Sequence, residues 1–270
     1  MFSISSGPFI SFYEESMQMK FFGIGLYSHV GFGRYMGFVF LVSLINLIYT
    51  GYFRKFHIDK IFFLVSFAGL IISGLRGAIL SSIVIAIIIT IYSLKKKNVS
   101  ALRIISFIGA AVLLVSAAVY FNHSFSILFY RFTQVYNIFH LELLSDGPIQ
   151  TRVHVYLNSF EIFMQNVVSG RGLGGYYDES LFSNTKGLKY PHNIFIEYAI
   201  ELGVIGLIFI SAVFIMIYRA VLKVNTLLAF IFLYFVLLAM FSYSIPFQTG
   251  LFSFMAFISL RKHLQLTINN

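Results

Sequence analysis

A histidine followed by two carboxylates is the part of the sequence best suited to chemistry. His192 opens an apolar stretch in which Asn193, Glu197 and Glu201 recur at intervals of four residues. An imidazole titrates near neutral pH and can accept a proton from a hydroxyl group, so His192 could act as a general base. The spacing places the other three residues on one face of a helix. Because carboxylates are costly next to hydrocarbon, we expect that face to contact protein rather than lipid.

The same residues have a structural interpretation. A single histidine at a helix end can simply form a hydrogen bond with the adjacent loop, and Glu197 and Glu201 could form ion pairs inside a helix bundle. The residue types alone leave the catalytic and the structural interpretation open.

Three arginines could bind an anion. Arg76 lies in a glycine-rich break between two apolar runs, Arg152 at the start of a helical pattern, and Arg171 in the glycine-rich segment 170–175. A guanidinium stays charged and forms forked hydrogen bonds with phosphate, and at Arg152 the positive end of a helix dipole would strengthen anion binding. Lipid headgroup contact or surface pairing is the alternative. It suits Arg171 better than Arg76, which interrupts an otherwise apolar hairpin.

Segment 170–175 also matches the G-x-G-x-x-G pattern of dinucleotide-binding proteins, and we reject that interpretation. No strand pattern precedes the segment and no helix opens from it. The glycines instead predict a tight backbone turn. The chain has no cysteine, and no group of His, Asp and Glu has the spacing of metal ligands. The sequence therefore predicts neither a metal nor a cofactor.

Long apolar runs must position these side chains. The chain is 59% hydrophobic and 11% charged, whereas soluble domains carry about 25% charged residues. A helix needs about 20 apolar residues to cross the hydrocarbon core of a bilayer. The sequence therefore predicts an all-α, polytopic transmembrane helix bundle of about seven spans. We expect them at residues 36–53, 61–75, 77–94, 101–121, 192–218, 226–244 and 249–260.

Charge placement sets the expected topology. Of the nineteen Lys and Arg residues, eleven lie in four short stretches between or after the apolar runs, and the positive-inside rule places these stretches in the cytoplasm. The net charge of +9 is therefore a topology signal, and no nucleic acid is expected as a partner. Arg76, residues 1–35 and a large loop at 122–191 are predicted to be extracytoplasmic.

The large loop contains an amphipathic helical pattern between residues 151 and 168. Its apolar side comprises Val153, Tyr156, Leu157, Phe160, Phe163, Met164 and Val167, and its polar side His154, Asn158, Glu161 and Gln165. We expect the apolar side to pack over the bundle or to lie in the membrane interface. No repeat or linker divides residues 1–270, which we interpret as a single membrane domain.

Several of these motifs together resemble a known family. His192-Asn193, followed after nine residues by the Gly-Val-Ile-Gly segment 203–206, matches the motif H-[N/S/Q]-x9-G-x-x-[G/T/Y] of the O-antigen ligase and O-antigen polymerase superfamily. The Ser-Gly-Leu-Arg-Gly break at 73–77 is similar to the same family. So is Arg152 followed by an amphipathic helix and a glycine-rich turn. The resemblance covers the C-terminal two-thirds of a typical member. Because members usually have ten or more spans, we expect a chain shortened at its N-terminus.

The resemblance implies an inverting, metal-independent membrane glycosyltransferase at the outer face of the bacterial inner membrane. Its donor would be a glycan on undecaprenyl pyrophosphate. His192 would deprotonate the acceptor hydroxyl, and Arg76 and Arg152, assisted by Arg171, would bind the pyrophosphate and stabilise it as it departs. Asn193, Glu197 and Glu201 would support the site.

Four functions remain open at this level. The first is a polymerase that joins lipid-linked repeat units into O-antigen, capsule or exopolysaccharide, with the chain-length regulator and flippase of the same pathway as partners. The second is a ligase that transfers the glycan to the lipid A core of lipopolysaccharide or to a protein. The third is a membrane transporter, which would need broken helices and ionisable groups near the midplane of the bilayer. The fourth is an inactive, shortened homologue.

Overall fold

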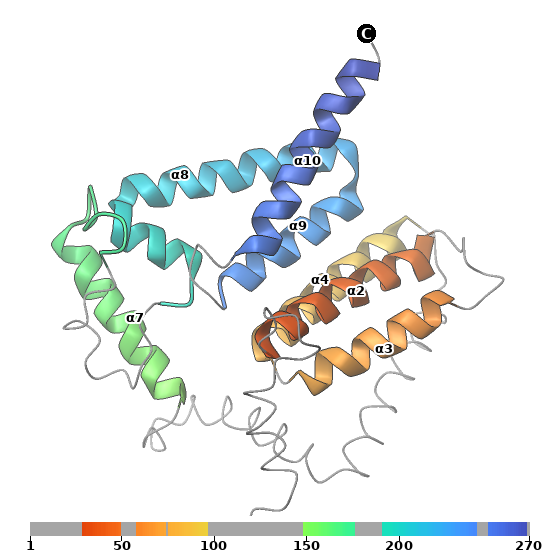
Figure 1. Ribbon diagram of the computed structural model, residues 1–270, viewed down its shortest axis with the longest axis horizontal. Coiled ribbons are helices and arrows are strands. Elements are labelled where there is room, and N and C mark those ends of the chain that lie inside the picture. Colours follow the sequence, from red (N-terminus) through yellow and green to blue (C-terminus); the bar gives the residue numbers. More distant parts are fainter. Residues whose placement is uncertain are drawn as a thin grey trace, which may run out of the picture. The chain divides into compact units, whose positions relative to one another are not determined.

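The computed structural model describes residues 29–49, 58–73, 75–96, 148–175, 191–241 and 248–268 (Figure 1). These residues form seven helices and no strand, in agreement with the predicted helical class. The chain divides into two compact units, residues 1–135 and 136–270, and each is described by itself. The expected span at 101–121 and much of the loop at 122–191 lie outside the described residues.

The first unit contains α2 (His29–Tyr49), α3 (Ile58–Ile72) and α4 (Arg76–Lys95). The ring of Phe40 on α2 packs against Phe63 and Phe67 on α3, with centroid distances of 5.0 and 5.7 Å. Helix α3 ends where the backbone N–H of Ser73 donates to the carbonyl of Gly69 (2.9 Å). The predicted break at 73–77 is therefore confirmed, since α3 ends at Ile72 and α4 begins at Arg76.

Helix α2 begins earlier than the sequence predicted. It starts at His29 and ends at Tyr49, whereas we expected a span at 36–53 and assigned 1–35 to an N-terminal segment. That boundary was wrong for residues 29–35. Gly33 lies against the α3–α4 turn so closely that an added Cβ would stand 2.6 Å from Ser73 Oγ. Packing against this turn holds glycine-containing residues in the helix, although glycine disfavours helix by itself.

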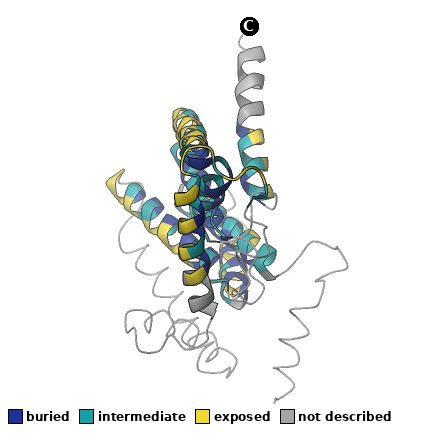
Figure 2. Cartoon of the chain, turned by 90° about the vertical axis from the view of Figure 1, so that its left-hand side faces the viewer, coloured by how far each residue is buried: buried dark blue, intermediate teal, exposed yellow. Residues whose placement is uncertain are grey.

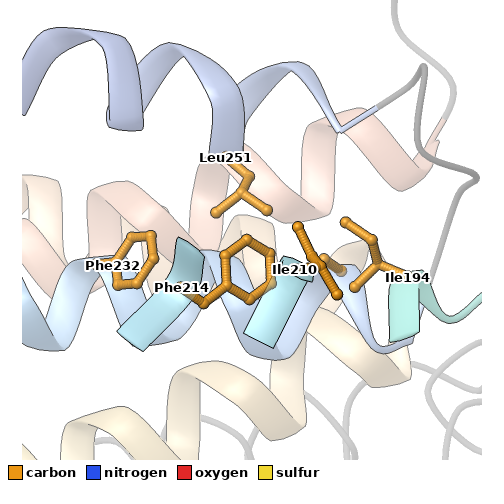
Figure 3. Close-up of a cluster of buried hydrophobic side chains, with 6 residues drawn as sticks. Ile194, Ile210, Phe214, Phe232 and Leu251 are labelled. Atoms are coloured by element: carbon orange, nitrogen blue, oxygen red, sulfur yellow. The ribbon is translucent and has the colours of Figure 1, made fainter. Parts of the chain in front are cut away.

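The second unit contains α7 (Pro148–Gln165), α8 (Ile194–Val224), α9 (Thr226–Ala239) and α10 (Thr249–Ile268). The predicted amphipathic helix is confirmed as α7. Helix α9 ends before the expected boundary at 244, and α10 continues past 260. Figure 3 shows Ile194, Ile210, Phe214, Phe232 and Leu251 converging in one core cluster formed by α8, α9 and α10.

Helix α8 is broken at Gly203, whose φ and ψ are 66° and −157°. In a straight helix Phe195 and Phe214 would be about 28 Å apart along the axis, yet their rings meet edge to face at 5.7 Å. The segment 194–202, which we call the arm, therefore turns back alongside the segment 204–224 (Figure 1). The expected single span at 192–218 was wrong in this respect, because a glycine backbone at Gly203 reverses the chain.

Among the residues that the structure describes, three helical stretches are by length and composition able to cross a membrane, namely Val30–Ile48, Arg76–Lys95 and Ile194–Val224. The part of α8 that follows Gly203 has 21 residues and is about 32 Å long at 1.5 Å per residue. This part can therefore span a bilayer by itself, and the arm is not needed to complete the span.

Candidate functional site

Asn193 starts the arm by capping it. Its side-chain Oδ1 accepts hydrogen bonds from the backbone N–H groups of Phe195 (3.0 Å) and Ile196 (3.4 Å). Such a cap satisfies N–H groups that have no partner within the helix and contributes about 1 kcal/mol. Asn193 is therefore the cap residue before the helix. Its spacing had suggested that it shares a helix face with the two glutamates, but its side chain is used for the cap instead.

His192 directly precedes this cap. It is the one non-glycine residue with a positive φ (54°) among the described residues. This conformation is uncommon for a residue with a side chain and is often found at functional sites. The imidazole is half-buried and its Nε2 atom is shielded from solvent. The unusual backbone conformation of His192 therefore contributes, together with the side-chain rotamer, to the position of the imidazole.

The two glutamates of the arm are buried, as predicted. Glu197 is 1% exposed and Glu201 is 6% exposed. The Glu201 carboxylate accepts a hydrogen bond from the backbone N–H of Gly174 through Oε1 (2.8 Å). This contact gives Glu201 a structural role, because it links the arm to the segment after α7.

Residues 166–175, which we call the glycine loop, bind to the break in α8. In a continuous helix the N–H of Val204 would donate to the carbonyl of Ile200. Here that carbonyl accepts from the N–H of Arg171 (2.9 Å), and the N–H of Val204 donates to the carbonyl of Val167 (2.7 Å). The N–H of Gly172 donates to the carbonyl of Glu201 (2.9 Å). Backbone groups released by the break are thus satisfied by the glycine loop.

Glycine is required on both sides of this contact. Gly170 (φ 68°) and Gly203 (φ 66°) each have a positive φ, and a Cβ on either would collide with backbone atoms of the other segment. The predicted tight turn in 170–175 is confirmed, since Gly172 and Gly174 also have positive φ. The first glycine of the segment 203–206 is therefore explained by the close approach of the two backbones.

The arm sets the spacing between an imidazole and a guanidinium. Arg171 has an exposed side chain, and its backbone is fixed to Ile200. Seven residues lie between His192 and Ile200, and the helical part from Ile194 to Ile200 rises about 9 Å along its axis, with Asn193 before it in an extended conformation. The arm therefore has His192 before its first residue and the backbone of Arg171 bonded near its other end.

A family model described as O-antigen ligase matches residues 61–211, more than half of the chain. The chain belongs to the O-antigen ligase family. No curated protein and no solved structure matches the chain. Membership in this family implies a membrane enzyme of the glycosyltransferase type. The matched residues include the arm and the glycine loop, together with all the candidate site residues of this O-antigen ligase family member.

Of the other two arginines, Arg76 lies at the expected break between two helices, whereas Arg152 is not at the start of its helix. Arg76 is the first residue of α4, and Leu75 at the cap position has no side-chain oxygen that could accept from the first-turn N–H groups. Arg152 is the fifth residue of α7, which begins at Pro148; its side chain lies outside the described residues. Because the helix dipole acts within the first turn, its favourable effect on an anion applies to Arg76 rather than to Arg152.

Sequence reasoning missed the contact between the glycine loop and the arm. The motif had identified Gly203 and the segment 170–175 separately. Two glycine-rich sites in one chain, one within an apolar helix, were the available signal, because interior glycines in helices often mark a close approach.

Proposed function

We propose that this O-antigen ligase family member is a polymerase at the extracytoplasmic face of the bacterial inner membrane. It joins oligosaccharide repeat units carried on undecaprenyl pyrophosphate into O-antigen, capsule or exopolysaccharide. In one displacement, the acceptor hydroxyl oxygen bonds to the anomeric carbon of the donor and the bond from that carbon to the pyrophosphate oxygen breaks. His192 takes the hydroxyl proton. The configuration inverts, and no metal is needed.

The binding of the glycine loop to the arm is the observation that carries this proposal. It fixes Arg171 at one end of a short helix that has His192 at the other end. A general base and a cation held near the two ends of one short helix suit a reaction in which a proton is removed on one side of the sugar and a diphosphate departs on the other.

Arg76 and Arg152 bind the donor pyrophosphate in this proposal. For Arg76, the N–H groups in the first turn of α4 add to the charge of the guanidinium. The family match, which includes both arginines, supports these roles.

A reconstituted transfer assay tests the base. The full chain in proteoliposomes receives a defined lipid-linked repeat unit, and polymer is measured by gel electrophoresis. His192→Ala should lower the transfer rate by about 100-fold or more. His154→Ala, an exposed histidine on α7, is the matched control and should keep full activity. Full activity of His192→Ala, with equal protein in the membrane, would exclude His192 as the base.

The same assay tests the arginines. Arg76→Ala and Arg152→Ala should each lower the rate by about 100-fold, whereas Arg219→Ala, an exposed arginine near the end of α8, should not. An unchanged rate for Arg76→Ala would remove that residue from the site.

A ligase is the second candidate, favoured by the description of the matching family. A polymerase forms a ladder of products from the lipid-linked unit alone, whereas a ligase forms product when lipid A core or an acceptor protein is added. The broken α8 with two buried carboxylates is also a feature that a transporter would need. Uptake of a labelled anion by the same proteoliposomes, unchanged by His192→Ala and without glycan transfer, would replace the enzyme proposal with transport.

A further inference from the structure

We propose that α7 lies in the membrane interface and inserts one face among the lipid acyl chains. This apolar face consists of Tyr156, Leu157, Phe160 and Met164. The proposal concerns how the helix is held at the membrane, and it does not rest on the catalytic roles given above.

The buried residues of α7 and its large exposed apolar residues lie on different faces of the helix. Val155, Ser159 and Ile162 are 1 to 2% exposed, and α7 packs on α8. Phe160 is 61% exposed and Met164 is 56% exposed. With about 100° of rotation per residue, the apolar face lies roughly opposite the buried one. The exposed apolar residues of α7 therefore lie on a different side of the helix from its buried ones. Figure 2 colours the chain by burial, with exposed residues in yellow and buried residues in dark blue.

A third face of α7 is polar. His154, Glu161 and Gln165 are exposed and lie between the apolar and the buried faces. A helix that presents one face to protein, one to lipid and one to water has the amphipathic pattern of helices in the headgroup region. Apolar side chains that gather on one exposed surface usually mark a contact with a partner or a membrane.

Exposed apolar side chains on α8, next to the end of α7, favour lipid as the occupant. Immediately after the break, α8 exposes Ile205, Ile208 and Phe209, and in a membrane-spanning helix such side chains contact acyl chains. At the same place the backbone of Val167 is hydrogen-bonded to Val204. Val168, which follows, is 65% exposed. The end of α7 is thus fixed to the beginning of the lipid-facing segment.

Depth-dependent quenching tests the proposal, and the absence of cysteine from the chain makes single labels straightforward. Phe160→Cys and Met164→Cys in the full chain receive an environment-sensitive fluorophore. Glu161→Cys and Gln165→Cys on the same helix are matched controls. Each protein is placed in vesicles of phosphatidylethanolamine and phosphatidylglycerol, and quenching by nitroxide-labelled lipids is compared with quenching by aqueous iodide.

Labels at 160 and 164 should be quenched several-fold more strongly by lipid nitroxide than labels at 161 and 165, with the reverse order for iodide. Iodide quenching at 160 equal to that at 161 would show that the apolar face is in water. Protection at 160 and 164 from both reagents would show that another protein segment covers it. Either result overturns the proposal, and two labelled positions guard against a single substitution that disturbs the fold.

Discussion

Two breaks in apolar helical sequence behave differently in this protein. At the end of α3, Ser73 Oγ donates to the carbonyl of Leu70 (2.6 Å) and accepts from the N–H of Leu75 (3.3 Å), so the turn supplies its own hydrogen-bond partners. At Gly203 the freed backbone groups find partners in the glycine loop, far away in the sequence. The first break shapes a hairpin. The second joins two distant segments that carry candidate site residues. Substitutions that disturb the second break should therefore lower the transfer activity.

Gly203→Ala should have the largest effect. The conformation at Gly203 is one that essentially only glycine adopts and costs about 1–3 kcal/mol for other residues, and the new Cβ would also collide with the backbone of Val168. We expect loss of transfer activity, a lower melting temperature in detergent and faster hydrogen exchange at the Arg171 amide. Gly172→Ala is the control, because its φ is also positive (93°) but no atom lies near its Cβ position. An Arg171 amide equally protected in both variants would contradict the structure of this break.

Glu201→Leu should have the next largest effect. It removes the acceptor of the Gly174 N–H, and an unsatisfied N–H of this kind costs about 1–3 kcal/mol. We expect a higher KM for the lipid-linked donor and faster exchange of the Gly174 amide. Glu201→Gln keeps an oxygen acceptor and should retain most of the activity. If both variants lose activity equally, the charge rather than the hydrogen bond matters.

Asn193→Ala should lower stability by about 1 kcal/mol through loss of the cap. Asn225→Ala removes an equivalent cap from α9, where Asn225 Oδ1 accepts from the N–H of Leu227 (2.7 Å). Both variants should unfold at slightly lower temperature, but activity should fall in Asn193→Ala alone, since this cap adjoins His192. If Asn193→Ala and Asn225→Ala have equal activities, the cap at the start of the arm has no role in the reaction.

Ser73→Ala should have the smallest effect. It tests the break after α3, which supplies its own hydrogen-bond partners. Loss of its two hydrogen bonds should cost about 1 kcal/mol and leave hydrogen exchange in the glycine loop unchanged. Ser66→Ala, which removes a buried hydroxyl bonded to a carbonyl inside α3, controls for the loss of a serine away from the turn. Faster exchange at the Arg171 amide in Ser73→Ala would show that the two breaks are coupled.

Much of the fold was predictable because it follows from local pattern. The apolar runs predicted the helices around the break at 73–77, and the spacing of residues 151–168 predicted α7. The boundaries at Gly33 and Gly203 were missed, because one glycine is held in a helix by packing and the other reverses the chain, and residue type does not distinguish these cases. The burial of Glu197 and Glu201 was predicted because hydrocarbon excludes carboxylates.

By itself the sequence determined that the chain is helical and apolar. It also determined the positions at which glycine permits an unusual backbone conformation, and it carries the His192-Asn193 and Gly203 motif of its family. Only the tertiary structure decided that the arm turns back, that the glycine loop fills the break, and which face of α7 remains exposed. The physical reason is that helix formation depends on neighbours within a few residues. In contrast, a carbonyl freed at a break bonds to whichever N–H group the rest of the fold brings within reach.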